Sequence, residues 1–491
     1  MSNKGWNLIL ASVVLGLCAI TSVAQTAQAT PPPPTAPHST VFPKPVEKNL
    51  PNGLRVIVVP RTEMPLVTAQ LLIKSGGEVD PADLAGVADM TATLLTRGTA
   101  TKSATQIAEA IEVLGGTLGS GAGWDSSTIT TNVASPRIGQ ALEIMADVVR
   151  NPSFKDEEIE RLRRQNLNGL RGAMATPGSI ARFVAARVVF RDSPYGHLLS
   201  GTPESLARIK RDDIVKIHSM YYRPDNAILV IGGDITGVNG FALAQKYFGD
   251  WQNPPSALPK LQITTPESTA AGRRILVIDQ PSAGQTAVLA VRSAISRDNP
   301  DYFRGIVANA VLSGYSGRLN WEIRVKRGLS YGAASQLDMR RSAGSFMASA
   351  QTKNQSGAEV ASLALAEIGK LATGELLDSE LSTRKASLLG GFARSMETTN
   401  GVVSQFGSLA MYGLPLDEIN RYIGNVQAIK ATDVKAFAAS RLNAASTSVV
   451  IVGNAKEFLP ELQKQFPNVE VIAVSDLDLN NANLKKTVST N

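Results

Sequence analysis

The sequence has almost no cysteine and no block of charge of one sign. Its 491 residues include a single cysteine, Cys18, which lies in an N-terminal apolar segment. The 49 Lys and Arg exceed the 42 Asp and Glu by only seven, and the excess is spread over the whole length. Nucleic-acid binding is therefore disfavoured, because proteins with that function concentrate positive charge on one surface.

The first 29 residues have the pattern of a secretory signal peptide. Lys4 supplies a positive start, residues 8–20 are apolar, and Ala27-Gln28-Ala29 is a small-residue cleavage site. No later segment approaches the roughly 18 apolar residues that a membrane-spanning helix needs. We therefore predict an exported protein, most simply periplasmic, without a transmembrane segment after cleavage.

Cleavage before Thr30 removes the only cysteine. The mature chain then has no disulfide, no catalytic thiol and no Cys-ligated metal. A lipid anchor on Cys18 is the alternative. It is disfavoured because the bulky Leu17 precedes the cysteine where a lipoprotein cleavage site needs a small residue.

Proline-rich stretches divide the chain. Residues 30–45 are predicted to form an extended tether, and a second proline-rich stretch predicts a linker at 256–269. The divisions give an N-terminal domain at 46–255, a C-terminal domain at 270–478 and a tail at 479–491. With 43% hydrophobic residues, both domains have enough apolar side chain for a packed core.

The two domains resemble each other in sequence. Ile209-Lys210 recurs as Ile429-Lys430, and the apolar run 229–231 recurs as 449–451, each time at an offset of 220 residues. Repetition at a constant offset indicates a duplicated domain of about 200 residues.

Each domain is predicted to have an α+β fold, a mostly antiparallel sheet packed with helices. Alternating apolar residues predict strands, and apolar residues at helical spacing predict helices. The expected strands in the first half are 54–59 and 66–74. The expected helices are 82–96, 104–114, 136–150, 155–174, 358–371 and 378–392.

The helix expected at 82–96 carries a recognisable motif. Asp80 can cap it, Pro81 suits its first turn, and the segment runs from Ala85-Gly86-Val87 to Gly98-Thr99. The segment resembles the metal helix of the pitrilysin or insulinase-type zinc peptidases, the inverzincins, which carry His-x-x-Glu-His between such flanks. In that motif two His hold zinc and the Glu takes a proton from the zinc-bound water.

The residues that perform this chemistry are absent from the sequence. Asp89, Ala92 and Thr93 stand at the positions of the first His, the Glu and the second His. The resemblance places a further Glu ligand near Asn168 and Gly169, where no acidic residue occurs. We therefore expect no zinc in this chain, and the simplest interpretation of Asp89 is a polar residue on a half-exposed helix. The three histidines do not have ligand spacing either: His38, His197 and His218.

A second motif is intact. Residues 312–319 and 322–331 are similar to the substrate-side motif of the same family, whose Arg and Tyr lie seven residues apart. Arg324 and Tyr331 match those two positions. The resemblance implies that this pair binds the peptide backbone near the scissile bond. Both side chains can donate hydrogen bonds to a carbonyl oxygen and stabilise charge that develops there.

The combination resembles the non-catalytic subunit of two-subunit family members. It implies a heterodimer in which a homologous partner carries zinc and this chain supplies Arg324 and Tyr331 to the peptide substrate. The chain then has no catalytic residues of its own and is inactive alone. The alternatives are a peptide-binding or structural assembly subunit without a role in proteolysis, and a self-sufficient peptidase, for which no zinc ligands are found.

The glycine-rich segment 115–125 lies where the family places the sheet edge that receives an extended peptide. Small side chains there leave room for a peptide to add as a strand. An ordinary loop is an equally good interpretation of the segment.

Overall fold

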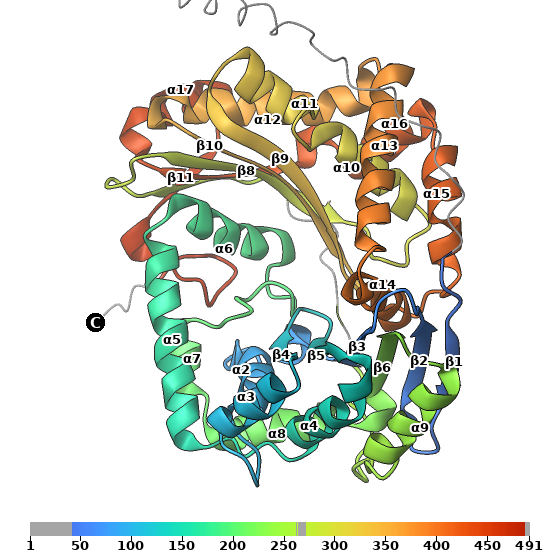
Figure 1. The fold of residues 1–491 in the computed structure, drawn as a ribbon. Helices are drawn as coiled ribbons and strands as arrows, with labels where there is room; N and C mark the ends of the chain where they lie inside the picture. The colour runs from blue at the N-terminus through green and yellow to red at the C-terminus, as the bar shows by residue number, and fades with distance from the viewer. Residues whose placement is uncertain (1–41, 262, 264–271, 487–491) are drawn as a thin grey trace, which may run out of the picture. The chain divides into compact units, whose positions relative to one another are not determined.

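The structure is a computed structural model that describes residues 42–261, 263 and 272–486 (Figure 1). The predicted signal peptide, with His38 and most of the tether, lies outside these residues. In the part described, the chain forms two six-stranded sheets. The strands of the first sheet, in spatial order, are β1 (Val46–Asn49), β2 (Arg55–Pro60), β6 (Ala227–Gly233), β3 (Leu66–Ile73), β5 (Ser127–Ala134) and β4 (Thr117–Ala122).

The second sheet repeats this order in five of its six strands, and its sixth strand, at the edge, comes last in the chain rather than first. Its strands are β12 (Val469–Ala473), β7 (Ile275–Asp279), β11 (Ser448–Gly453), β8 (Thr286–Ala294), β10 (Gly344–Thr352) and β9 (Ser330–Met339). Antiparallel pairs predominate in both, the exceptions being β2–β6 in the first sheet and β12–β7 and β7–β11 in the second. The predicted α+β fold is confirmed.

Helices follow the strands in each half of the chain. In the first half they are α2 (Val87–Leu94), α3 (Ala104–Val113), α4 (Ile138–Arg150), α5 (Asp156–Met174), α6 (Pro177–Phe190), α7 (Pro203–Arg208), α8 (Arg211–Tyr221) and α9 (Gly237–Phe248). In the second half they are α10 (Tyr302–Leu312), α11 (Arg318–Asn320), a π-helix (Trp321–Lys326), α12 (Gly357–Thr373), α13 (Asp378–Ser395), α14 (Thr399–Met411), α15 (Glu418–Ala428), α16 (Ala431–Arg441) and α17 (Leu459–Gln465). Short 3-10 turns lie at Gly77–Val79, Leu95–Arg97, Ser135–Arg137, Pro224–Asn226, Asn354–Ser356, Ala444–Ser446, Ala455–Glu457 and Val474–Asp476. None of the helices in the described ranges is long and apolar enough to cross a membrane.

The helix predicted at 82–96 begins later than expected, at Val87. Gly86 precedes it with a φ of 94°, and a Cβ added there would lie 2.8 Å from the backbone nitrogen of Gly201. Only glycine fits this close left-handed position, and it interrupts the helix that the apolar spacing predicts. Asp80 still caps the helix from a distance, because its carboxylate accepts hydrogen bonds from the amides of Gly86 at 2.7 Å and Ala88 at 2.8 Å. Pro81, expected in the first turn, lies outside the helix.

The repeated sequence motifs adopt the same local structure. The amide of Lys210 donates to the carboxylate of Asp213 at the start of α8, and the amide of Lys430 donates to Asp433 at the start of α16, both at 2.8 Å. These bonds satisfy one of the amides that a helix N-terminus leaves without a partner. The duplication is therefore visible in capping as well as in strand order.

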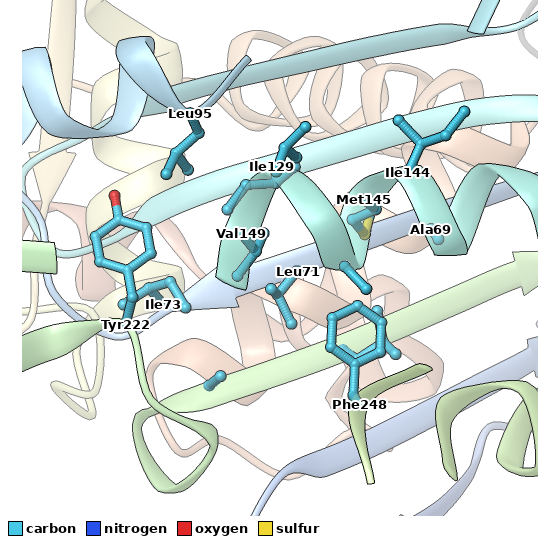
Figure 2. Packing of buried hydrophobic residues seen from close by; sticks show 14 of the residues in the cluster. Ala69, Leu71, Ile73, Leu95, Ile129, Ile144, Met145, Val149, Tyr222 and Phe248 are labelled. Carbon is cyan, nitrogen blue, oxygen red and sulfur yellow. The ribbon is translucent and has the colours of Figure 1, made fainter. Parts of the chain in front are cut away.

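One face of the first sheet packs on helices of its own half. Figure 2 shows Leu71 and Ile73 of β3 beside Met145 and Val149 of α4, and these four side chains are almost completely buried. Successive side chains of a strand point to opposite faces, so the neighbouring Leu72 points away from this cluster.

The opposite face of each sheet is covered by a helix from the other half. Leu72 and Val230 pack against Val403 and Phe406 of α14, which lies on β3 and β6. In the same way α6, from the first half, lies on β8 and β11 of the second sheet. The central strands are apolar at nearly every position because both of their faces are buried.

A polar contact also joins the halves. The Arg341 side chain forms an ion pair with Glu78 at 3.2 Å and donates to the backbone carbonyl of Lys74 at 3.0 Å. Its backbone amide donates to the buried carboxylate of Asp125 at 2.8 Å, which also accepts from Tyr195. These contacts fix the end of the glycine-rich segment against the second half.

Residues 479–486, expected to belong to a tail, pack on α6. Arg187 donates to the carbonyl oxygens of Leu479 and Asn480, both at 3.0 Å, and Leu484 is fully buried. The predicted linker 256–269 lies partly outside the described residues, so the division into domains at 46–255 and 270–478 stays a prediction.

Phe406→Ala should destabilise the first sheet although the residue belongs to the second half. Removing this buried ring is expected to cost about 3–5 kcal/mol and to weaken amide-exchange protection in β3 and β6. Hydrogen–deuterium exchange and denaturant unfolding measure the two effects. Val113→Ala, at an exposed position, is the control and should change stability by less than about 0.5 kcal/mol. Loss of protection confined to the second half would contradict the exchange of helices.

Candidate functional site

The three positions of the degenerate metal motif lie together on α2. Ala92 is fully buried, while Asp89 and Thr93 are half-buried. Asn168 and Gly169 of α5 are exposed, and the side-chain oxygen of Asn168 accepts a hydrogen bond from Arg171. Of these residues only Asp89 is of a type that zinc commonly takes as a ligand, so the set does not fit a zinc ion.

Neither described histidine is arranged as a metal ligand. The Nε2 of His218 lies 2.7 Å from the carbonyl oxygen of Val149, and burial lowers the pKa of this imidazole. The Nε2 of His197 lies 3.1 Å from the carboxylate of Asp80, and its ring packs edge-on against Trp124. Across residues 42–261, 263 and 272–486, no group of three or more His, Cys, Asp or Glu could hold a metal ion.

A cavity of about 460 Å³ surrounds Asp89. Burial and the nearby charge of Asp80 both disfavour the ionised carboxylate, which raises the pKa of Asp89 to about 6. Asp89, at the position that the resemblance assigns to the first zinc ligand, thus places a carboxylate in a mainly apolar cavity. Its walls include Trp124, Phe183, Val189, Phe190, Leu198, Leu199, Val291, Phe346 and Met347, with Arg182, His197, Asp338 and Arg340 among the polar residues.

The intact Arg/Tyr motif spans the π-helix, which contains Arg324, and the start of β9, which contains Tyr331. Hydrogen bonds join both parts to the loop that precedes the π-helix. Asn320 donates to the carbonyl of Tyr315 at 2.5 Å and accepts from the amide of Ala333 at 3.2 Å. Arg318 forms a two-pronged ion pair with Glu380, with both contacts at 2.8 Å. The loop, the π-helix and the start of β9 are thereby held in one arrangement.

The hydrogen bonds that hold this region together do not involve the side chains of Arg324 and Tyr331. The Arg324 guanidinium lies over the Tyr315 ring, 4.9 Å from its centre, and Tyr331 is 92% exposed. Within the described residues neither side chain makes a hydrogen bond or an ion pair. Both line one cavity of about 550 Å³, together with Asn320 and Ser349. Both side chains can thus donate hydrogen bonds to a carbonyl oxygen of a ligand in this cavity.

The two cavities adjoin along β9 and β10. Arg182 of α6 lines both of them. Residues 345–347 of β10 line the Asp89 cavity, and residues 349–351 line the Arg324/Tyr331 cavity. The packing of α6 on the second sheet brings residues from four distant segments together.

The glycine-rich segment forms an edge strand. β4 pairs only with β5, and a Cβ added at Gly119 or Gly121 would meet nothing within 4 Å. The expected sheet edge is confirmed, and the alternative of an ordinary loop is wrong for 117–122.

The comparisons with known proteins agree with this geometry. Residues 55–194 match the family described as Insulinase (Peptidase family M16), and residues 208–388 match the Peptidase M16 inactive domain. Together the matches cover more than half of the chain. The chain belongs to the insulinase family. Within it the chain is of the inactive type, because residues 208–388 match the inactive-domain model.

Relatives that are named as zinc proteases match most of the chain. An uncharacterized zinc protease of Mycobacterium leprae is 25% identical over 399 residues, which are 80% of this chain and 88% of the relative. An uncharacterized zinc protease of Rickettsia bellii is 25% identical over 411 residues, which are 82% and 97% of the two chains.

Solved structures share the fold. A peptidase M16 inactive domain from Pseudomonas fluorescens has a TM-score of 0.77 and 26% identity, covering 83% of this chain and 98% of that one. A protease from Helicobacter pylori has a TM-score of 0.77 and 22% identity, covering 84% and 100%. The periplasmic protease PqqL from Escherichia coli has a TM-score of 0.67 and 15% identity, covering 88% and 51%.

Sequence reasoning missed the cavity around the degenerate motif of this insulinase-family chain. Arg182, His197 and Arg340 line it, but they are distant in sequence and carry no shared motif. The one available signal was an acidic residue at a position that the resemblance assigns to a metal ligand, and Asp89 had the simpler interpretation of a polar residue on a half-exposed helix.

Asp89→Asn should make stability less dependent on pH. The carboxyl has an ordinary pKa of 3.8 and a pKa of about 6 in the folded protein. The folded state therefore holds the proton more tightly, and Asp89 lowers stability as the pH rises from about 4 to about 6. The gain from the substitution should be about 2 kcal/mol larger at pH 7 than at pH 4. The titratable groups near Asp89 are Asp80, Arg182, His197, Tyr222, Asp338 and Arg340.

Denaturant unfolding at the two pH values provides the measurement. Asp83→Asn, an exposed position on the approach to the same helix, is the matched control and should show no such difference. An equal gain at pH 4 and pH 7 would contradict a raised pKa at Asp89.

Proposed function

We propose that this chain is the non-catalytic subunit of an exported zinc-dependent peptidase heterodimer. A homologous partner subunit supplies the zinc and its activated water, and this chain supplies Arg324 and Tyr331 to the peptide. The observation that carries the proposal is a pair of donors, Arg324 in the π-helix and Tyr331 at the start of β9, that line one cavity and make no hydrogen bond or ion pair within the described residues. The described part of the chain also holds no group of residues that could bind a metal ion.

The chemistry of the pair suits a carbonyl oxygen. A guanidinium carries several N–H donors and a permanent charge, and a phenol donates one O–H. Aimed at the oxygen of a scissile peptide bond, the two groups orient the carbonyl and stabilise negative charge as water attacks. The preformed loop holds them in place, so little reorganisation accompanies the reaction.

The surroundings of the pair support a covering partner. Tyr315, Trp321, Val325 and Tyr331 are all more than half exposed and lie within one 17-residue stretch around the loop. Large apolar side chains gathered on a surface mark places where another molecule binds. The proposed partner would cover this surface and bring its zinc to Arg324 and Tyr331.

Two edge strands offer backbone to a peptide. β4 ends the first sheet, and β9, which contains Tyr331, ends the second. An extended peptide that adds to such an edge is held by main-chain hydrogen bonds, which depend little on its sequence. We infer broad peptide specificity for the complex. Export follows from residues 1–29, with the periplasm as the compartment.

Arg324→Ala should lower the turnover of the complex by about 100-fold without preventing assembly, because it removes a donor to the developing charge. Tyr331→Phe should lower turnover less, since it removes one hydroxyl and keeps the ring. Peptide-cleavage kinetics on purified complexes provide the measurement, with size-exclusion chromatography to establish assembly.

Lys326→Ala is the matched control in the same π-helix. Its side chain is 61% exposed, contacts Glu322 and lies outside the lining of the Arg324/Tyr331 cavity. Its turnover should equal that of the unsubstituted complex. Unchanged turnover in a folded Arg324→Ala complex would remove Arg324 from the proposed mechanism.

Peptidase activity should follow the partner and not this chain. Material that co-purifies with the tagged chain from its native cells should cleave peptides until a zinc chelator is added, and the chain purified alone should cleave none. A stable partner without any cleavage would instead favour a structural or peptide-binding assembly role. Chelator-sensitive cleavage by the chain alone would contradict the assignment of zinc to a partner.

A further inference from the structure

We infer that the Asp89 cavity binds the first residue of a peptide, with a bulky apolar side chain in the cavity and the terminal ammonium on the Asp89 carboxylate. This inference deepens the proposed function and rests on it, because it assigns the cavity to the same peptide that reaches Arg324 and Tyr331. It gives the degenerate metal position a role in recognising substrate.

The cavity walls favour an apolar ligand group. Its volume of about 460 Å³ lies in the range of small-molecule sites in proteins. Trp124, Phe183 and Phe190 contribute aromatic surface, and Val291 and Met347 contribute aliphatic surface from the second sheet. A large apolar side chain placed there loses its contact with water, which is the main source of binding energy at such sites.

One carboxylate among the charged groups that line the cavity is available to a cationic group of a ligand. Asp338 is paired with Arg340 at 2.8 Å, and His197 is held by Asp80 at 3.1 Å. Arg182 is exposed at the edge of the cavity. Of the lining carboxylates, Asp89 has no hydrogen bond or ion pair within the described residues.

A half-buried carboxylate without a partner has lost part of its hydration and gained nothing in return. An ammonium group against Asp89 replaces that hydration with a charge-assisted hydrogen bond. A neutral apolar ligand would leave the carboxylate unpaired. The cavity therefore favours amines over neutral compounds of the same shape.

We assign a peptide as the rest of the ligand because the cavity lies beside the Arg324/Tyr331 cavity. Strands β9 and β10 run along both, and Arg182 lines both. Each extended residue advances a chain by about 3.3 Å, so a few residues beyond the terminal ammonium suffice to reach the second cavity. A free amino acid would fill only the first.

The test uses the full chain without its partner and the probe Phe-Ala-Ala-Ala amide. Titration calorimetry measures affinity, and tryptophan fluorescence reports on Trp124 in the cavity wall. The N-acetylated probe, which lacks the ammonium, should bind at least tenfold more weakly. Asp89→Asn should weaken binding of the free-amine probe to a similar degree, and Asp83→Asn should leave it unchanged.

A variant with a filled cavity and a shorter probe complete the test. Ala186→Trp places a large side chain in the cavity lining and should abolish binding, with circular dichroism to establish folding. Phenylalanine amide should bind more weakly than the tetrapeptide probe. Equal affinity of the two compounds would assign the cavity to a free amine and overturn the peptide. Retained affinity in Asp89→Asn, or equal binding of the acetylated probe, would overturn the role of Asp89.

Failure of this inference is distinguishable from failure of the proposed function. Probe binding is measured on the isolated chain, whereas the turnover of Arg324→Ala is measured on the complex. Loss of turnover in Arg324→Ala without ammonium-dependent probe binding would overturn only the role of the cavity. If turnover is normal in that variant and the probe still binds, the chain has a peptide site, but Arg324 has no role in catalysis by the complex.

Discussion

The structure depends on one packing constraint: each sheet is apolar on both faces, and its own half of the chain covers only one of them. α14 covers the second face of the first sheet, and α6 covers the second face of the second sheet (Figure 1). Because burial of apolar surface is the main favourable contribution to folding, neither sheet is complete without the other half. The duplicated halves are therefore interlocked rather than merely tethered.

The same constraint assembles the candidate site. With α6 held on β8 and β11, its exposed Arg182 lies where the two cavities meet. The Arg341 contacts to Glu78 and to Asp125 hold the β9–β10 connection beside the end of the glycine-rich segment. The proposed peptide site, which uses both halves, therefore depends on the contacts between them.

The sequence revealed the features that are encoded locally. Alternating apolar residues located β2 and β3 to within a residue, and the recurrence of Lys210–Asp213 at Lys430–Asp433 revealed the duplication. The two motifs that suggested the family were readable because each lies within a short stretch, and the family matches confirm that resemblance. The roles assigned to Arg324 and Tyr331 stay a prediction.

Features that depend on contacts between distant segments could not be read in this way. The start of α2 depends on the approach of Gly86 to Gly201, more than one hundred residues away. The cavity around Asp89 combines α2, α6 and strands β9 and β10, which no periodicity links. Apolar runs predicted buried strands but gave no sign that the covering helix would come from the other half.

Because the helix that covers the first sheet comes from the other half of the chain, it is synthesised long after the strands that it covers. β6, which completes the interior of the first sheet, ends at Gly233, but α14 begins only at Thr399. At ribosomal speeds of about 5–20 residues per second, the intervening stretch takes on the order of ten to thirty seconds to synthesise. Throughout that interval the first sheet lacks the helix that covers its second face in the folded protein. The exposed apolar side chains then favour aggregation unless another molecule covers them or the sheet has not yet formed.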